Sequence, residues 1–189
     1  MARIHPLPEG AWSSELLEIF SRLPAGVREQ GAPPRILTTL ARNAELFRTW
    51  IPFGMKLLVQ SGLPPRDREL ATLRVAWNCR AEYVWGNHAV IARELGFTEA
   101  ELAAIPAFGK NAEHPWSAAD RSILRACDEL HTDKRLSAGT WAELAERYDE
   151  EQLIEFPMLV GQYAMIAMTL NSLGLEPEQG TPGLPAEPV

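Results

Sequence analysis

The chain has 189 residues, of which 46% are hydrophobic and 23% are charged. This length and composition are typical of one globular domain that buries its own core. The formal net charge of -7 excludes a strongly basic surface, and it argues against a nucleic-acid backbone or an anionic membrane as the main partner.

Only two cysteines occur, Cys79 and Cys127, and there is no CxxC pattern. This usage gives no sign of a disulfide or zinc framework and suits a reducing compartment. The first ten residues, MARIHPLPEG, contain no apolar stretch of signal-peptide length. No run approaches the roughly 20 apolar residues of a membrane-spanning helix. We therefore expect a cytoplasmic protein that has no membrane partner.

The N-terminal third is predicted to be helical after an extended arm of ten residues. Apolar residues recur at helical spacing over residues 12–23, 36–41 and 44–61. Pro24 ends the first of these helices. Pro52, near the start of the third, is predicted to mark a boundary or a kink.

Two amphipathic helices joined by a short turn are predicted in the middle of the chain. The first covers residues 65–77, with Glu69 among the acids of its opening turn, where a helix favours negative charge. After a turn at residues 78–80, the second helix reaches Leu95. A capping box at Thr98 and Glu101 then opens a short helix.

The C-terminal part is predicted to hold three more helices after a loop at residues 106–116. They are expected over residues 117–131, 137–148 and 149–173, and Pro157 is expected to kink the last one. No segment alternates like a strand. The prediction is a single all-α domain over residues 1–175 with seven to nine helices, followed by a Pro-rich flexible tail over residues 176–189.

The central helix pair predicts a chemical site built on Glu69 and His88. Glu69 lies about 11 residues before the turn at Arg80 and His88 about 8 after it, which corresponds to roughly 16 and 12 Å along the two helices. An antiparallel pair therefore brings them to similar heights. A carboxylate that orients an imidazole is a common arrangement for acid-base chemistry. The alternative is a helix-start acid and a core histidine without a chemical role.

Other polar and aromatic residues of this segment are candidates for the same site. Glu82 is either a solvated acid at a helix start or a proton carrier at the rim. Tyr83 and Trp85 either line a pocket for a planar substrate or belong to the core. Arg74 is a local cation for an anionic substrate. Cys79 is either inert or a thiol activated by a helix N-terminus.

A metal site is conceivable at Asp128, His131 and Asp133, which form a D-x-x-H-x-D cluster. A histidine near a helix C-terminus more often interacts with the helix dipole, and no third convergent ligand is evident. We therefore predict no metal. Tyr163 lies among methionines on the last helix, a pattern more typical of core or subunit interface than of a cofactor site.

The pattern REL-x-x-LR-x-AW-x-C-x-AEY-x-W-x-x-H resembles the core hairpin of the carboxymuconolactone decarboxylase and alkylhydroperoxidase-D-like family, and the resemblance covers roughly residues 35–105. Peroxidase-type members carry a Glu, a CxxC with a Tyr just before its second Cys, and a His four residues after that Cys. Glu69, Tyr83 and His88 match this order. Ala81 and Val84 occupy the cysteine positions, so the chain is more similar to the decarboxylase-like branch.

The resemblance implies an all-helical subunit that assembles into trimers or hexamers around small-molecule pockets. It also implies decarboxylation of a carboxylated unsaturated lactone or related organic acid without metal or organic cofactor. In that reaction His88 would donate to the oxyanion or carry the proton, and Glu69 would orient it. Glu82 or Tyr83 would be a second proton carrier, and Trp85 would form an apolar wall.

Two other functions stay open at this point. The first is reduction of peroxides by Cys79 with an external thiol, which the missing CxxC disfavours. The second is a family scaffold that binds a ligand and catalyses nothing.

Overall fold

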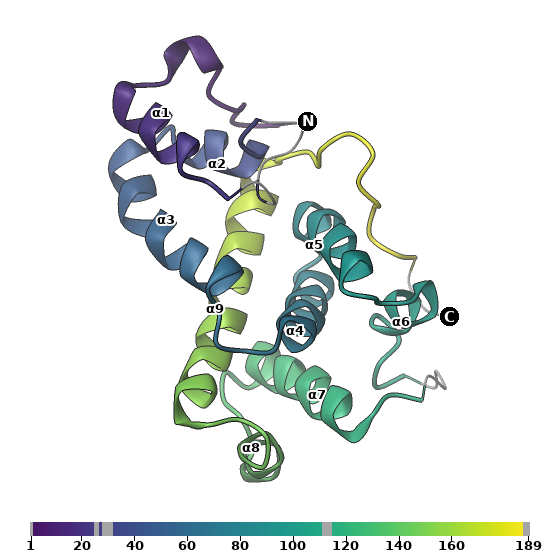
Figure 1. Cartoon of the computed structure of the whole chain (residues 1–189). Coiled ribbons are helices and arrows are strands. Elements are labelled where there is room, and N and C mark those ends of the chain that lie inside the picture. The colour runs from purple at the N-terminus through teal and green to yellow at the C-terminus, as the bar shows by residue number, and fades with distance from the viewer. Residues whose placement is uncertain (1, 25–26, 28–31, 111–114, 187–189) are drawn as a thin grey trace.

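The structure is a computed structural model that describes residues 2–24, 27, 32–110 and 115–186. In these residues it contains nine α-helices, one short 3-10 helix and no β-strand, so the predicted all-α class is confirmed (Figure 1). In chain order the elements are η1 (Glu9–Ala11), α1 (Ser14–Ser21), α2 (Arg35–Leu40), α3 (Ala44–Val59), α4 (Pro65–Asn78), α5 (Glu82–Glu94), α6 (Glu99–Ala104), α7 (Ala118–Thr132), α8 (Ala138–Ala145) and α9 (Glu150–Leu173).

Polar caps determine where several helices begin and end. The Thr98 hydroxyl accepts a hydrogen bond from the Glu101 backbone N–H at 3.2 Å, and the Glu101 carboxylate accepts one from the Thr98 N–H at 2.8 Å. This is the predicted capping box of α6. Asp149 and Gln152 form a second box at the start of α9, and α9 ends at Gly174, whose φ of 64° lies in the left-handed region.

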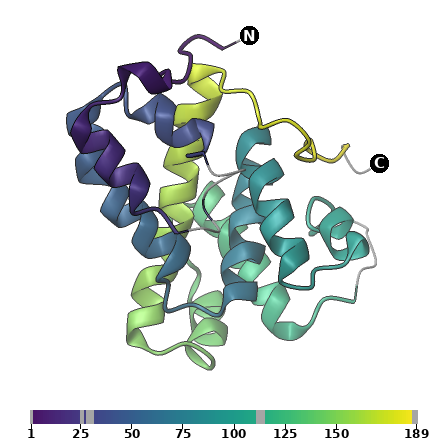
Figure 2. The ribbon, with the colours of Figure 1, turned by 45° about the horizontal axis from the view of Figure 1, so that its top comes forward.

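The fold is organised around α4. From Glu69 to Trp77 every residue of this helix is buried, and it packs most extensively against α5, α7 and α9. Figures 1 and 2 both place α4 beside these three helices. A helix surrounded on all sides buries its polar residues as well as its apolar ones. The predicted amphipathic character of this helix is therefore wrong, and its charged side chains are interior groups.

Helices α1, α2 and α3 form a second apolar cluster on the far side of α9 from α4 (Figure 2). Its buried members are Leu16, Phe20, Leu23, Leu37, Ala41, Phe47 and Ile51. The α3 helix continues through Pro52, so the predicted boundary at that residue is absent. The cluster faces α5 and α9, and this arrangement leaves room for a cavity between the two parts of the core.

The α9 helix is long and apolar enough to cross a membrane by length and composition alone, contrary to the expectation from the sequence. Half of its most apolar window is buried inside the fold. Leu159 and Ala167 are fully buried in the main core. The helix therefore serves here as a core element of a helical domain.

The segment after α9 is held against the fold at Glu178, although the sequence predicts a flexible tail from residue 176. One carboxylate oxygen of Glu178 accepts hydrogen bonds from the Arg35 N–H at 2.9 Å and from the Tyr83 hydroxyl, and the other accepts one from the Asn87 amide at 3.1 Å. This carboxylate therefore caps the N-terminus of α2 and binds two side chains of α5. Residues 187–189 lie outside the described chain.

Candidate active site

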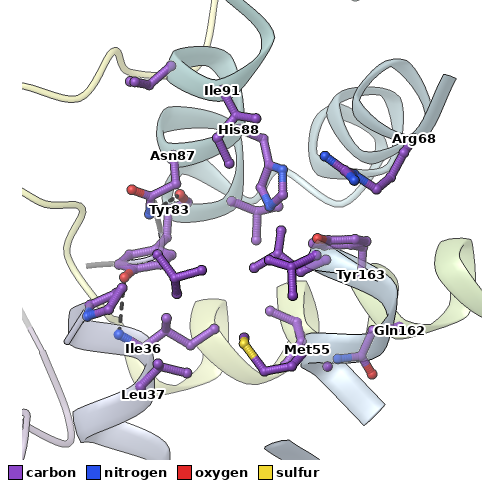
Figure 3. Close-up of a pocket in the computed structure, with 18 of the residues that line it drawn as sticks. Ile36, Leu37, Met55, Arg68, Tyr83, Asn87, His88, Ile91, Gln162 and Tyr163 are labelled. Carbon is purple, nitrogen blue, oxygen red and sulfur yellow. Dashed lines mark hydrogen bonds between the residues drawn. The ribbon is translucent and has the colours of Figure 1, made fainter. Parts of the chain in front are cut away.

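A cavity of about 380 Å³ lies between α2 and α3 on one side and α4, α5 and α9 on the other. This volume falls in the roughly 300–1,000 Å³ range of small-molecule pockets. Its wall is mostly apolar, with Ile36, Leu37, Met55 and Ile91 among the residues drawn in Figure 3. The polar groups that reach it are few, and they determine what chemistry the cavity can support.

Glu69 and His88 meet at the wall of this cavity. The His88 Nδ1 atom and the Glu69 Oε2 atom are 2.6 Å apart, and the two residues are 7% and 0% exposed. The antiparallel packing of α4 and α5 brings them to the same level, as their distances from the turn predict. His88 lines the cavity, whereas Glu69 is not part of its lining. Because Glu69 accepts from Nδ1, the second ring nitrogen, Nε2, is the one available to a bound molecule.

The Glu69 carboxylate remains ionised although it is fully buried. Burial by itself raises the pKa of Glu69, but the charges and hydrogen bonds of His88 and Arg68 outweigh it and lower the pKa. Burial and the Glu69 charge raise the pKa of Tyr163, so its phenol stays protonated. The Tyr163 ring meets the His88 ring edge to face at 4.8 Å and limits its rotation.

Arg68 lines the cavity and is a residue that the sequence reasoning missed. Its Nε atom donates to Glu69 Oε1 at 2.8 Å, so one carboxylate holds both the guanidinium and the imidazole. Arg68 directly precedes Glu69 near the start of α4. Helical periodicity cannot distinguish a solvated charge in a first turn from one that faces a cavity.

Two further polar atoms of the cavity residues lack a hydrogen-bond partner. They are the Gln162 Oε1 atom on α9 and the Trp50 Nε1 atom on α3, both shielded from solvent. Gln162 is 6% exposed. Leaving such an atom unpaired typically costs about 1–3 kcal/mol, so these groups favour a polar guest in the cavity. The only available sequence signal for Gln162 is a lone amide within the apolar run of α9.

The structure assigns different surroundings to the predicted aromatic residues. Tyr83 lines the cavity with its ring, while its hydroxyl accepts from the Ile36 N–H at 3.1 Å and donates to Glu178. Trp85 is 3% exposed and belongs to the main core, not to the cavity wall. The cavity-facing side of α5 is the side of Val84, and the predicted apolar wall at Trp85 is not there.

Glu82 and Arg74 also lie away from the cavity lining. Glu82 is exposed at the start of α5. The Arg74 guanidinium donates to both carboxylate oxygens of Asp128 at 2.7 Å and to the Ile105 carbonyl at 2.5 Å. Arg74 thereby joins α4 to α7 and to the end of α6. Its donors are used in this structural network, so the cation near the imidazole is Arg68.

Cys79 is the C-cap of α4 and is half-buried, and it does not line the cavity. Burial raises its pKa, which supports the inert alternative over activation by a helix N-terminus. Its Sγ atom lies 4.0 Å from His131 Nδ1. Cys127 is fully buried, and burial raises its pKa strongly. Both thiols are therefore poor nucleophiles in this fold.

The D-x-x-H-x-D cluster does not form a metal site in the described part of the chain. The Asp128 carboxylate is bound by Arg74 and by the Asn78 amide at 2.8 Å. Among the described residues, no three His, Cys, Asp or Glu side chains converge anywhere in the structure.

Residues 44–113 match the family model described as the carboxymuconolactone decarboxylase family. This match contains α3, α4 and α5 and thus most of the cavity wall. No curated protein matches the sequence.

Solved structures share the fold over most of the chain. An uncharacterized peroxidase-related protein with an alkylhydroperoxidase AhpD core, from Ralstonia eutropha JMP134, is 18% identical with a TM-score of 0.75 over 94% of this chain and 93% of that one. A peroxidase-related protein from Silicibacter sp. TM1040 is 15% identical with a TM-score of 0.72 over 90% and 88%. The debrominase Bmp8 in complex with 2,3,4-tribromopyrrole is 17% identical with a TM-score of 0.74 over 93% and 91%. At these identities the likeness concerns the fold, which is alkylhydroperoxidase-D-like.

Proposed function

We propose that the chain is an acid-base enzyme that decarboxylates a small, flat, carboxylated lactone or related acid, and the match of residues 44–113 to the carboxymuconolactone decarboxylase family model supports this. One observation carries the proposal: the 2.6 Å contact between Glu69 and His88 at the wall of a largely apolar cavity. A blocked pocket, or a carboxylate too far from the imidazole, would have favoured a scaffold without catalysis.

The proposed reaction breaks the bond between a substrate carbon and its carboxylate. The electron pair moves into the conjugated system toward the lactone carbonyl oxygen, and CO2 leaves. A proton from His88 Nε2 then reaches carbon, and the ionised Glu69 stabilises the imidazolium that supplies it. These steps need an acid and a donor for the developing oxyanion, and they do not require a metal or an organic cofactor.

The apolar wall supports this chemistry. Val84 of α5, Leu37 of α2 and Ile166 of α9 are among the apolar residues that line the pocket, and such groups solvate a carboxylate poorly. A charge concentrated on a carboxylate loses more in such surroundings than a charge dispersed over a conjugated system. The debrominase relative binds tribromopyrrole, a small flat ring, which supports a guest of this shape for the present cavity.

Peroxide reduction by a thiol has less support. The pKa of Cys79 is raised and this residue is away from the cavity, while Cys127 is fully buried with its Sγ atom donating to the Ala71 carbonyl. Neither position gives a thiolate that a peroxide and a second thiol can both reach. The geometry thus favours the imidazole over the thiols as the reactive group.

The proposal is tested by CO2 release from carboxymuconolactone with purified wild type and His88→Gln. Loss of a general acid-base group lowers kcat by about 10²–10⁴-fold. His131→Gln is the matched control, since this exposed histidine lies outside the cavity, and it should retain wild-type turnover. A folded His88→Gln variant with unchanged turnover would exclude the imidazole as the proton carrier.

The thiol alternative is tested in the same preparation. Cys79→Ser should leave CO2 release unchanged, and neither wild type nor the variant should reduce hydroperoxide with an added thiol. Peroxide reduction by wild type that Cys79→Ser abolishes, together with no CO2 release, would reverse the choice between the two functions.

A further inference from the structure

One cation of the cavity has no role in the reaction as described so far. The Arg68 side chain is 13% exposed, and only its Nε atom is bonded, to Glu69 Oε1 at 2.8 Å. Its terminal nitrogens make no hydrogen bond to any other described residue. In Figure 3 the guanidinium extends from α4 toward His88 and Tyr163 across the cavity. It therefore presents free donors at the same end of the pocket as the imidazole.

The shared carboxylate determines where these donors lie. Glu69 Oε1 binds Arg68 and Glu69 Oε2 binds His88 Nδ1, so the guanidinium and the imidazole are fixed on the two oxygens of one buried group. A bound molecule that contacts the free edge of Arg68 therefore lies at the same end of the cavity as His88. A substrate oxygen and the adjacent reacting carbon can engage the two residues together.

The charges at this end of the cavity favour a negative oxygen. Among the described residues that line the cavity, Arg68 is the only permanent cation, and Glu94, exposed on α5, is the only carboxylate. Tyr163 is a neutral phenol here, and Glu69 already balances one positive charge. When His88 is protonated, the group carries one net positive charge. Poorly hydrated donors of this kind interact with a developing anion far more strongly than donors in water.

We propose that Arg68 is a catalytic residue whose terminal guanidinium nitrogens hold the oxyanion that forms on the conjugated carbonyl oxygen of the substrate. This inference rests on the proposed decarboxylation. An ion pair between Arg68 and the departing carboxylate would stabilise charge that the reaction must disperse, and would slow it. The electron pair that CO2 leaves behind instead rests on the carbonyl oxygen beside Arg68 until the His88 imidazolium donates a proton to carbon. The substrate class is thus a flat conjugated molecule that forms an enolate-like oxyanion.

The test uses 4-nitrophenol, a flat dye whose phenol ionises near neutral pH and whose phenolate absorbs visible light. The ionisation constant of the dye should be about tenfold or more higher when it is bound to wild type than in solution, since hydrogen bonds to charged donors stabilise the phenolate. Arg68→Met should abolish this gain, and Arg68→Lys should keep part of it. Arg93→Met, at an exposed position of α5 outside the cavity, should keep all of it.

A neutral analogue separates loss of the oxyanion contact from loss of the cavity. 4-Nitroanisole has the same ring and nitro group but carries a methyl group on the oxygen and cannot ionise, so it should bind wild type and Arg68→Met with similar affinity. A bound dye that ionises no more readily than free dye, a gain that survives Arg68→Met, or no binding of either compound would overturn the proposal. The dye needs no turnover: dye ionisation promoted by Arg68 in a protein that releases no CO2 would refute the decarboxylation and leave the oxyanion site in place.

Discussion

Replacing Glu69 by Gln tests the group on which the whole site depends. The carboxylate is fully buried and accepts from His88 at 2.6 Å and from Arg68 at 2.8 Å. Gln keeps the volume but has only one acceptor oxygen, and its NH2 group meets a donor on the other side. One of the two former partners therefore loses its acceptor inside the protein.

The size of the stability loss in Glu69→Gln follows from the burial of this carboxylate. Removing one partner of a buried ion pair costs about 3–5 kcal/mol. One amide oxygen remains as an acceptor and Arg68 retains some solvent contact, so we expect about 3 kcal/mol of lost stability, at the low end of that range. For a domain of this size, 1 kcal/mol corresponds to about 2–4 °C, which predicts a Tm lower by roughly 6–12 °C.

Urea unfolding followed by circular dichroism measures this loss directly. Glu99→Gln is the matched control, because Glu99 also pairs with an arginine, Arg93, but at the surface, and its unfolding midpoint should not change. The double variant Glu69→Gln/His88→Gln should lose less stability than the sum of the losses in the two single variants, because both substitutions remove the same contact. A Glu69→Gln variant with the wild-type midpoint would show that the carboxylate is not paired in a buried position.

Two further predictions concern acid stability and the C-terminal segment. The folded-state pKa of Glu69 is lowered, so the stabilisation of the fold by this carboxylate is complete above its usual pKa of 4.5. This stabilisation is lost as the pH falls through the folded-state pKa. The unfolding curves of wild type and Glu69→Gln should therefore converge in acid and differ most above pH 4.5. Gly86→Ala places a Cβ 2.9 Å from the Pro182 carbonyl and 3.0 Å from the Thr181 hydroxyl, which should displace this segment, expose it to limited proteolysis and cost about 1–3 kcal/mol. Gly161→Ala, a helical glycine with open space around it, should instead stabilise by up to about 1 kcal/mol, and equal behaviour of the two variants in thermal unfolding would contradict the packing of Thr181 and Pro182 on α5.

Assembly into trimers or hexamers stays a prediction. On α9 the apolar side chains Ile154, Met158, Met165 and Met168 are exposed. Such residues along one helix are compatible with a subunit interface, and Tyr163 on the same helix faces inward to the cavity. The methionines and Tyr163, which form one pattern in the sequence, therefore belong to opposite sides of α9.

The nine α-helices of the described residues were all predictable from the sequence, because the signals that start and stop a helix lie within a few residues. Thr98 with Glu101, and Gly174 at the end of α9, are examples in which the cap chemistry alone marks the boundary. The meeting of Glu69 and His88 was predictable for a related reason: a short turn between two helices makes equal distances from the turn into equal heights.

The composition of the cavity depended on tertiary structure alone. Arg68, Gln162 and Trp50 reach it from three different helices, α4, α9 and α3, and no local pattern relates their side chains. The rotation of α5 puts Val84 at the cavity and Trp85 in the core, although the two residues are adjacent in the chain. Local sequence determines that a helix forms and where it ends, since its hydrogen bonds join neighbours in the chain; which of its faces meets a cavity is decided only by the helices that pack against it.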